Sequence, residues 1–141
     1  MLSFPYTKVE GRSSIPILNI YLQNPLDSRL STNFDMAILD TGSDITIVSY
    51  EIVSKLQLRP IDSQKSTSFR GLGRETQGIP YRIKLSFDDR DYISSKVIAV
   101  PDDILQGETI IGRNILNRYV IAFDGPKLVF TIGYSLPARR I

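Results

Sequence analysis

The stretch Ala37-Ile38-Leu39-Asp40-Thr41-Gly42-Ser43-Asp44 decides how this chain is expected to fold. It predicts an apolar strand that runs into a carboxylate, a hydroxyl and a glycine. Such a strand would carry the Asp40 carboxylate to the edge of a hydrophobic core, and Gly42 would let the backbone turn tightly and leave room for another group. On these residues alone, an Asx turn that merely ends a strand is an equally good interpretation, because Asp, Thr, Gly and Ser all favour turns.

Two further motifs, at 69–73 and 108–116, lie before and after an alternating segment at 81–87. Glu108-Thr109-Ile110-Ile111-Gly112-Arg113-Asn114-Ile115-Leu116 places an apolar pair and a glycine before an arginine at an expected helix start. Arg113 could pair with a carboxylate, and Asp44 is the partner that we expect. Phe69-Arg70-Gly71-Leu72-Gly73 is typical of a flexible hairpin tip. It is not a dinucleotide-binding fingerprint, because Arg74-Glu75-Thr76 stands where a third glycine would be needed.

Short runs rich in Ile, Val, Tyr and Phe, separated by Gly and Pro, predict strands along most of the chain. The clearest alternation, at 81–87, indicates a half-buried strand. The expected strands are 15–22, 34–39, 45–48, 81–87, 92–100, 119–123 and 128–132, with short helices near 49–56 and 112–118. About eight or nine short strands and two short helices indicate an all-β domain, mainly antiparallel and closed or folded over on itself.

The composition excludes several kinds of enzyme. The chain has 141 residues, 42% apolar and 23% charged, which suits one domain with a packed core. It has no Cys and no His, so a disulfide framework, a zinc–thiolate site and Ser-His or Cys-His dyads are ruled out. Acid–base chemistry would have to use carboxylates, Lys, Tyr or a bound cofactor.

The net charge and the hydropathy pattern also limit the kinds of partner that we expect. A net charge of +2 from 17 basic and 15 acidic residues gives little support to nucleic-acid binding. The sequence has no apolar run long enough to span a bilayer and no signal-peptide pattern at its start, which predicts a cytoplasmic protein without a membrane partner. The turn Asp88-Asp89-Arg90-Asp91 is expected to be solvated rather than a calcium site, because no glycine-centred loop spacing follows it.

In their order and spacing, the three motifs resemble those of the retropepsins, the single-domain aspartic proteases of the retroviral type. Asp40-Thr41-Gly42 matches the active-site triplet, Gly71-Leu72-Gly73 the flap tip, and Ile110-Ile111-Gly112-Arg113-Asn114 the start of the helix. The resemblance implies a closed β barrel or folded sheet with one or two short helices and a flap hairpin. It covers roughly residues 15–132, so we expect an N-terminal extension at 1–14, a candidate dimer strand, and a C-terminal tail at 133–141.

The resemblance implies an aspartic endopeptidase that needs no cofactor and no metal. The chain carries one triplet, so a complete site would need a symmetric homodimer with Asp40 from each subunit. Its partners would be a second copy of itself and a peptide or protein substrate. Thr41 would bond across the dimer axis, and Gly42 would offer its backbone to the substrate. Asp44 and Arg113 would form an ion pair that braces the active-site loop.

The resemblance also implies a set of residues that contact the substrate. Ser43 is expected to donate its hydroxyl to the Asp40 carboxylate and so to stabilise the charged form. The flap residues would close over the substrate and exclude water. Isoleucines would line side-chain pockets for apolar substrate residues, with plain core positions as the alternative. The substrate-binding set is Ile38, Ser43, Asp44, Ile47, Gly71, Leu72, Gly73 and Ile110.

Two other functions remain open from the sequence. The first is a retropepsin-like module that dimerises or binds peptides but turns over weakly, and the intact Asp-Thr-Gly argues against it. The second is a metal hydrolase that uses carboxylates alone. Asp40 and Asp44 lie four residues apart, but no further Asp or Glu cluster is spaced to complete a metal site.

Overall fold

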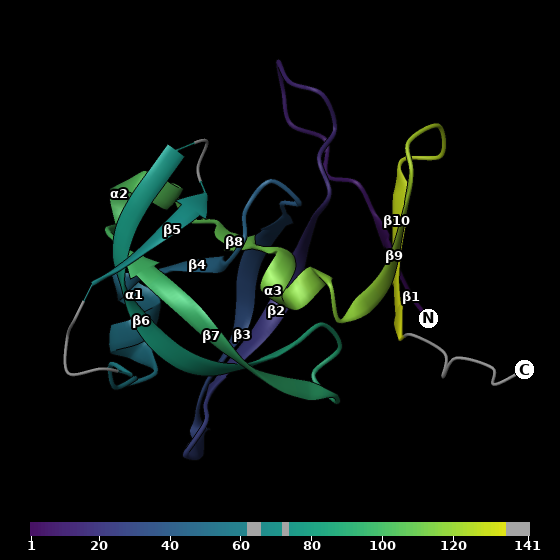
Figure 1. Ribbon diagram of the computed structural model, residues 1–141. Coiled ribbons are helices and arrows are strands. Elements are labelled where there is room, and N and C mark those ends of the chain that lie inside the picture. Colours follow the sequence, from purple (N-terminus) through teal and green to yellow (C-terminus); the bar gives the residue numbers. More distant parts are fainter. Residues whose placement is uncertain (62–65, 72–73, 135–141) are drawn as a thin grey trace, which may run out of the picture.

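A closed barrel forms the body of the molecule in the computed structural model, which describes residues 1–61, 66–71 and 74–134 (Figure 1). One sheet of seven strands runs in the order β2-β3-β8-β4-β7-β6-β5, and β2 also pairs with β6. That extra pairing closes six strands into a ring and leaves β5 as an extension of β6. The strands are β2 (Ile17–Asn24), β3 (Asp27–Leu39), β4 (Thr46–Ser49), β5 (Thr67–Gly71), β6 (Arg74–Ser86), β7 (Tyr92–Val100) and β8 (Thr109–Ile111).

A second sheet stands beside the barrel and holds the N-terminal end of the chain (Figure 1). Its strand order is β1-β10-β9, and both pairings are antiparallel. The strands are β1 (Leu2–Pro5), β9 (Tyr119–Asp124) and β10 (Val129–Tyr134). The helices are short: α1 (Tyr50–Lys55), α2 (Asp102–Leu105) and α3 (Arg113–Leu116), which leads from the barrel into β9.

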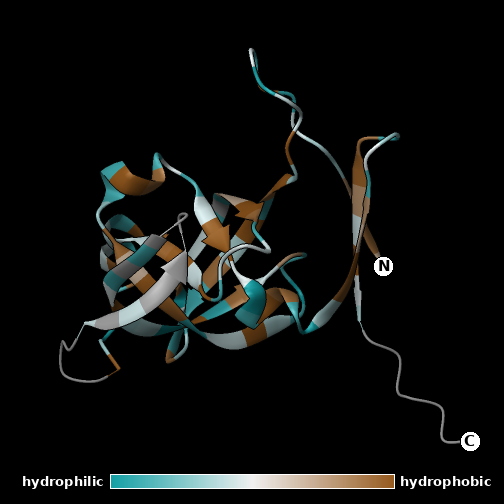
Figure 2. Ribbon diagram, turned by 45° about the horizontal axis from the view of Figure 1, so that its top comes forward, coloured by the Kyte–Doolittle hydropathy of each residue, from teal (hydrophilic) through white to brown (hydrophobic). Residues whose placement is uncertain are grey.

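The hydrophobic core joins the two sheets. Alternate residues of β2, β6 and β7 point inward, as the period-two pattern of the sequence predicts. Phe130 and Ile132 of β10 are buried in the same cluster as the barrel residues, so the inner face of the second sheet closes one side of the core. Hydrophobic segments accordingly follow the strands of both sheets in Figure 2.

The expected all-β fold is confirmed, with local differences. The described residues form ten strands and three helices, where eight or nine strands and two helices were expected. The helix α2 was not expected, because four residues after Pro101 are too few to show a helical pattern. The expected cap of α1 is confirmed: Ser49 Oγ accepts a hydrogen bond from Ile52 N at 3.4 Å.

The N-terminal segment pairs with the end of the domain, and a hairpin stands at the position of the flap. Residues 2–5 of the expected extension form β1, which pairs with β10 of the same chain. Strands β5 and β6 form an antiparallel hairpin where the flap is expected. Leu72 and Gly73, at its predicted tip, lie outside the described residues. None of the helices in the described parts of the chain is long and apolar enough to cross a membrane.

Candidate active site

Asp40 follows the last residue of β3, at the edge of the barrel core. Ala37 and Leu39 are buried, and the parallel pairing with β8 places Leu39 beside Ile111. The backbone N–H of Asp40 donates to Ile111 O at 2.9 Å, which continues the ladder by one residue. Asp40 itself is half-buried, so the strand delivers its carboxylate from the core to the surface.

The loop after Asp40 folds around the carboxylate. Gly42 N donates to Asp40 Oδ1 at 2.8 Å, and Ser43 N donates to Asp40 O at 3.2 Å. A Cβ atom on residue 42 would lie 3.1 Å from the same carboxylate oxygen, so a side chain there would crowd it. Thr41 and Gly42 are exposed. The local structure is thus an Asx-type turn, and it presents the carboxylate outward on an accessible loop.

Ser43 does not make the hydrogen bond that the sequence suggested. Its side chain is fully buried, and Ser43 Oγ donates to Ile45 O at 2.7 Å. A hydroxyl has a single proton to donate, so this bond replaces the expected one to the Asp40 carboxylate. The donor to that carboxylate is instead the backbone N–H of Gly42. Ser43 therefore stabilises the shape of the loop.

The start of α3 holds this loop from behind. Arg113 N donates to Ser43 O at 2.8 Å, and Arg113 Nη1 donates to Thr41 O at 2.6 Å. Gly112 allows the close approach, because a Cβ atom at that position would lie 2.3 Å from Ile45 O. The ion pair between Arg113 and Asp44 stays a prediction.

A polar network that sequence reasoning missed extends this support into the barrel. Thr46 Oγ1 accepts from Gly112 N at 3.1 Å and donates to Asn114 Oδ1 at 2.9 Å. Asn114 Nδ2 in turn donates to Ser95 Oγ and to Lys96 O. Thr46 and Ser95 are buried. The available signal was Thr46 within the apolar run 45–48 and Ser95 within the strand expected at 92–100, since buried polar groups need partners.

Three of the predicted pocket residues meet on one face of the sheet. Ile110 lies opposite Ile38 in the parallel β3–β8 pair and opposite Ile47 in the β4–β8 pair. Ile38 and Ile110 are half-buried. Ile47 is fully buried and belongs to a small cluster whose other buried members are Ile98, Val100 and Leu105. In a single chain, Ile38 and Ile110 therefore offer surface to a ligand, while Ile47 occupies the core position that was the alternative.

Two of the other predicted residues belong to described segments. Asp44 is exposed on the loop, and Gly71 is the last residue of β5. Across the described parts of the chain, no three Asp or Glu side chains are grouped so as to hold a metal ion. The loop therefore carries the carboxylates of Asp40 and Asp44, backbone amides and the guanidinium of Arg113. Of the two, the Asp40 carboxylate is the one that a backbone N–H orients within the turn.

Comparisons with known proteins agree with this geometry. A family model described as aspartyl protease matches residues 32–115, more than half of the chain, and this stretch contains both Asp40 and Arg113. No curated protein matches the sequence. Among solved structures, a retropepsin-like aspartic protease from Rickettsia conorii is similar, with 15% identity and a TM-score of 0.63; the match covers 94% of this chain and 90% of that one.

A second solved structure, the EIAV protease in complex with the inhibitor HBY-793, is also similar. Its identity is 19% and its TM-score is 0.52, and the match covers 78% of this chain and 92% of that chain. At these identities the two structures show a shared fold. The family model relates the chain to aspartyl proteases by sequence as well. Its match begins within β3, before the Asp40 loop.

Proposed function

The chain belongs to the aspartyl protease family, and on this basis we propose that it is an endopeptidase, active as a homodimer in which each subunit supplies Asp40. The observation that carries the proposal is the Asp40 loop. Its carboxylate reaches the surface on an exposed turn, and α3 fastens that turn by two hydrogen bonds from Arg113. One chain thus provides one well-positioned carboxylate, which is half of what the chemistry needs.

The reaction would use the two Asp40 carboxylates as a coupled pair that shares one proton. Aspartic proteases are themselves the standard example of such a pair. The ionised carboxylate would take a proton from water, whose oxygen bonds to the carbonyl carbon of the substrate. The protonated carboxylate would give its proton to the carbonyl oxygen. The C–N bond would then break as the amide nitrogen takes up the proton that the first carboxylate removed from water. The other carboxylate would recover a proton from a hydroxyl group of the intermediate, so neither His nor Cys is required.

The other loop residues would organise this pair. Thr41 is exposed beside Asp40, which supports a hydrogen bond from its hydroxyl across the dimer axis. Gly42 is exposed and has no side chain, which supports an approach of the substrate backbone. An ion pair between Asp44 and Arg113 would add to the backbone contacts that Arg113 makes. Residues Gly71, Leu72 and Gly73 of the flap would close over the substrate.

The second sheet would supply the dimer surface. Most of its outward-facing residues are uncharged, among them Ser3, Val120, Ala122 and Thr131, and Asp124 at the end of β9 is a charged one. Val120 is 52% exposed, and among the described residues the strands β1 and β9 are each paired on one side only. Uncharged and partly apolar surface of this kind is typical of the centre of protein interfaces. This supports the assignment of the N-terminal segment 1–14 to dimer formation.

The substrate preference would be set by apolar pockets. Ile38 and Ile110 lie side by side and retain exposed area near the end of β3 that carries Asp40. Ile47 is buried in the core, and Ile110 packs against its cluster. An apolar wall next to the reacting carboxylates favours apolar side chains on the residues that flank the cleaved bond. Ser43 would act through the loop rather than by touching the substrate.

The direct test is cleavage of a mixed peptide pool by the wild-type protein and by Asp40→Asn. We expect a loss on the order of 10³-fold or more in the variant, since it removes the acid–base pair. Asp103→Asn, on the exposed helix α2, removes the same charge far from the loop in sequence and should cleave as the wild type does. Equal cleavage by wild type and Asp40→Asn would contradict the catalytic assignment.

Three further outcomes separate the alternatives. Peptide binding without cleavage by either protein would favour a peptide-binding module over an enzyme. Inhibition by a statine-type transition-state mimic, with no effect of EDTA, is the result expected for an aspartic protease. Loss of activity in EDTA would favour a metal hydrolase instead.

A further inference from the structure

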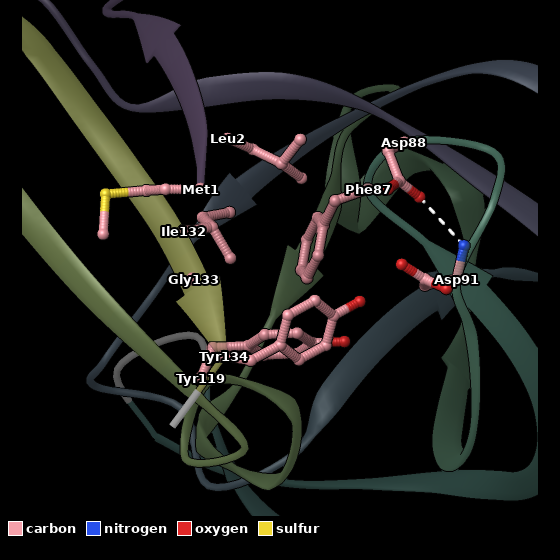
Figure 3. Close-up of a pocket in the computed structure, with 9 residues that line it drawn as sticks. All are labelled: Met1, Leu2, Phe87, Asp88, Asp91, Tyr119, Ile132, Gly133 and Tyr134. Atoms are coloured by element: carbon pink, nitrogen blue, oxygen red, sulfur yellow. Dashed lines mark hydrogen bonds between the residues drawn. The ribbon is translucent and has the colours of Figure 1, made fainter. Parts of the chain in front are cut away.

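A pocket of about 200 Å³ lies where the end of the second sheet meets the turn between β6 and β7, and it is separate from the Asp40 loop (Figure 3). Phe87, Tyr119 and Tyr134 form an aromatic wall, and Ile132 contributes apolar surface. The carboxylates of Asp88 and Asp91 lie opposite the tyrosines, whose hydroxyl groups point toward them in Figure 3. The pocket thus joins aromatic rings with negative charge.

The aromatic wall is continuous and partly open. The ring of Phe87 meets the ring of Tyr119 edge-on, with centroids 5.2 Å apart. Tyr119 and Tyr134 are tilted toward each other, with centroids 5.7 Å apart. Phe87 is buried and Tyr119 is half-buried, whereas Tyr134 is 60% exposed. A ligand can therefore reach this wall from the side of Tyr134.

The acidic side of the pocket is held in place by the turn. Asp88 Oδ1 accepts hydrogen bonds from Ser86 Oγ, from Arg90 N and from Asp91 N. These bonds, that from Asp91 above all, lower the pKa of Asp88, so its carboxylate is charged at neutral pH. Asp91 is exposed and lines the pocket together with Tyr134 (Figure 3). The turn holds three carboxylates and one arginine, which leaves it negative.

We propose that this pocket binds a guanidinium group, such as the side chain of an arginine. A guanidinium is planar and weakly hydrated, so it can stack on Tyr134 and Tyr119 while its N–H groups bond the carboxylates of Asp88 and Asp91. Charge-assisted bonds of this kind are among the stronger ones in proteins. A metal ion fits less well, because it would exchange its water for aromatic carbon on one whole side of the pocket.

The phenols support a cationic ligand over an anionic one. Burial raises the pKa of Tyr119 to about 12, and the nearby Tyr134, Asp88 and Asp91 contribute in the same direction, against the opposing effect of Arg118. The hydroxyl groups therefore stay neutral and the rings keep their electron-rich faces. An anion would meet the two carboxylates at close range. The site rests on the pocket itself and not on the proposed peptidase activity.

The test is binding of Nα-acetyl-arginine amide, followed by NMR shifts of the tyrosine rings. The uncharged isostere Nα-acetyl-citrulline amide is the ligand control. We expect a dissociation constant on the order of 1 mM for the arginine compound and binding at least about tenfold weaker for citrulline. Equal binding of the two compounds would overturn the proposal, because shape alone would then explain it.

Matched variants locate the site. Asp91→Asn should weaken binding about tenfold, the usual effect of losing one charge-assisted bond. Asp89→Asn removes the same charge from the same turn, but Asp89 accepts the Tyr92 hydroxyl and does not line the pocket, so binding should stay unchanged. Tyr134→Leu should weaken binding, whereas Tyr134→Phe keeps the ring and should retain most of it. Equal effects of Asp89→Asn and Asp91→Asn would overturn the proposal.

The source of the guanidinium can be separated in the same experiment. Arg139 and Arg140 follow Tyr134 closely in the sequence, so this chain could itself supply the ligand. Tighter binding of the probe to an Arg139→Ala/Arg140→Ala double variant would show that the chain's own arginines compete for the pocket. Unchanged affinity would assign the ligand to another molecule. Failure of the probe to bind either protein at tens of millimolar would overturn the proposal.

Discussion

Arg113 Nη1 lies 2.6 Å from Thr41 O and donates a hydrogen bond to it, which joins the first residue of α3 to the loop that carries Asp40. The backbone N–H of Arg113 holds the next part of the same loop through Ser43 O, at 2.8 Å. A helix start thus fixes the loop at two points on either side of Gly42. The position of the Asp40 carboxylate depends on this brace as well as on the strand that precedes it.

Replacing Arg113 tests the brace. Arg113→Ala should lower kcat by at least about tenfold with a smaller effect on KM, since a small displacement of a reacting group costs rate more than binding. Arg118→Ala is the matched control, because Arg118 Nη1 also donates to a backbone carbonyl, Ser94 O at 2.9 Å, but away from the loop. Both variants should lose about 1 kcal/mol of unfolding free energy. Similar kcat values for the two would show that the brace is only structural.

Replacing Gly112 tests how closely α3 must approach the loop. A Cβ atom there would lie 2.3 Å from Ile45 O, although φ is −93° and the backbone conformation itself suits any residue. We expect Gly112→Ala to cost more than about 3 kcal/mol of unfolding free energy in urea, because a backbone carbonyl must move. Gly125→Ala meets nothing within 4 Å and should change stability by no more than about 0.5 kcal/mol. Equal stability of the two variants would contradict the described contact.

Ser43→Ala separates a structural role from a catalytic one. The hydroxyl donates to Ile45 O, so its loss should lower the unfolding free energy by about 1 kcal/mol. The pH dependence of cleavage should keep its shape, because the bond to the Asp40 carboxylate comes from Gly42 N. Ser54→Ala, at an exposed position of α1, controls for the loss of a hydroxyl. A displaced acid limb in Ser43→Ala would restore the original expectation of a Ser43–Asp40 contact.

The raised pKa of Tyr119 predicts a loss of unfolding free energy at alkaline pH. Burial, more than any other cause, raises the pKa of Tyr119 from 10 to about 12, so folding favours the protonated phenol. The stabilisation is complete below pH 10 and is lost as the pH rises toward 12, because the unfolded chain releases its proton first. Tyr119→Phe cannot titrate and should lose less unfolding free energy over this interval. Parallel curves for the two proteins in urea unfolding at pH 9 to 12 would contradict the assignment.

Much of the fold could be predicted from the sequence because its signals are local. Alternation marked the inner face of β6, Ser49 marked the start of α1, and the acidic turn marked the hairpin from β6 to β7. The closure of the barrel through β2 and β6 could not be predicted, nor could the parallel pairing of β3 with β8. Such registers depend on contacts between distant strands, which no local pattern encodes.

In the candidate site, too, the residues in local patterns could be predicted and the contacts between distant residues could not. Asp40 and Gly42 were found because a carboxylate and a glycine after an apolar strand form a local pattern, and Gly112 and Arg113 because they begin a helix. The network of Thr46 with Asn114 was missed, since it spans 68 residues of sequence. The error at Ser43 has a physical cause. A neighbour in sequence was assumed to face the carboxylate, whereas the turn directs its hydroxyl toward Ile45 O in the buried interior.

If each chain holds half of an active site, mixing active and inactive subunits will show it. Wild type and Asp40→Asn are mixed in varying proportion at constant total concentration, allowed to exchange, and assayed for cleavage. If both subunits supply Asp40 to one site, activity falls as the square of the wild-type fraction, to about a quarter in an equal mixture. Activity that falls in direct proportion to the wild-type fraction, to about half in the same mixture, would mean that each chain acts alone and would contradict the account.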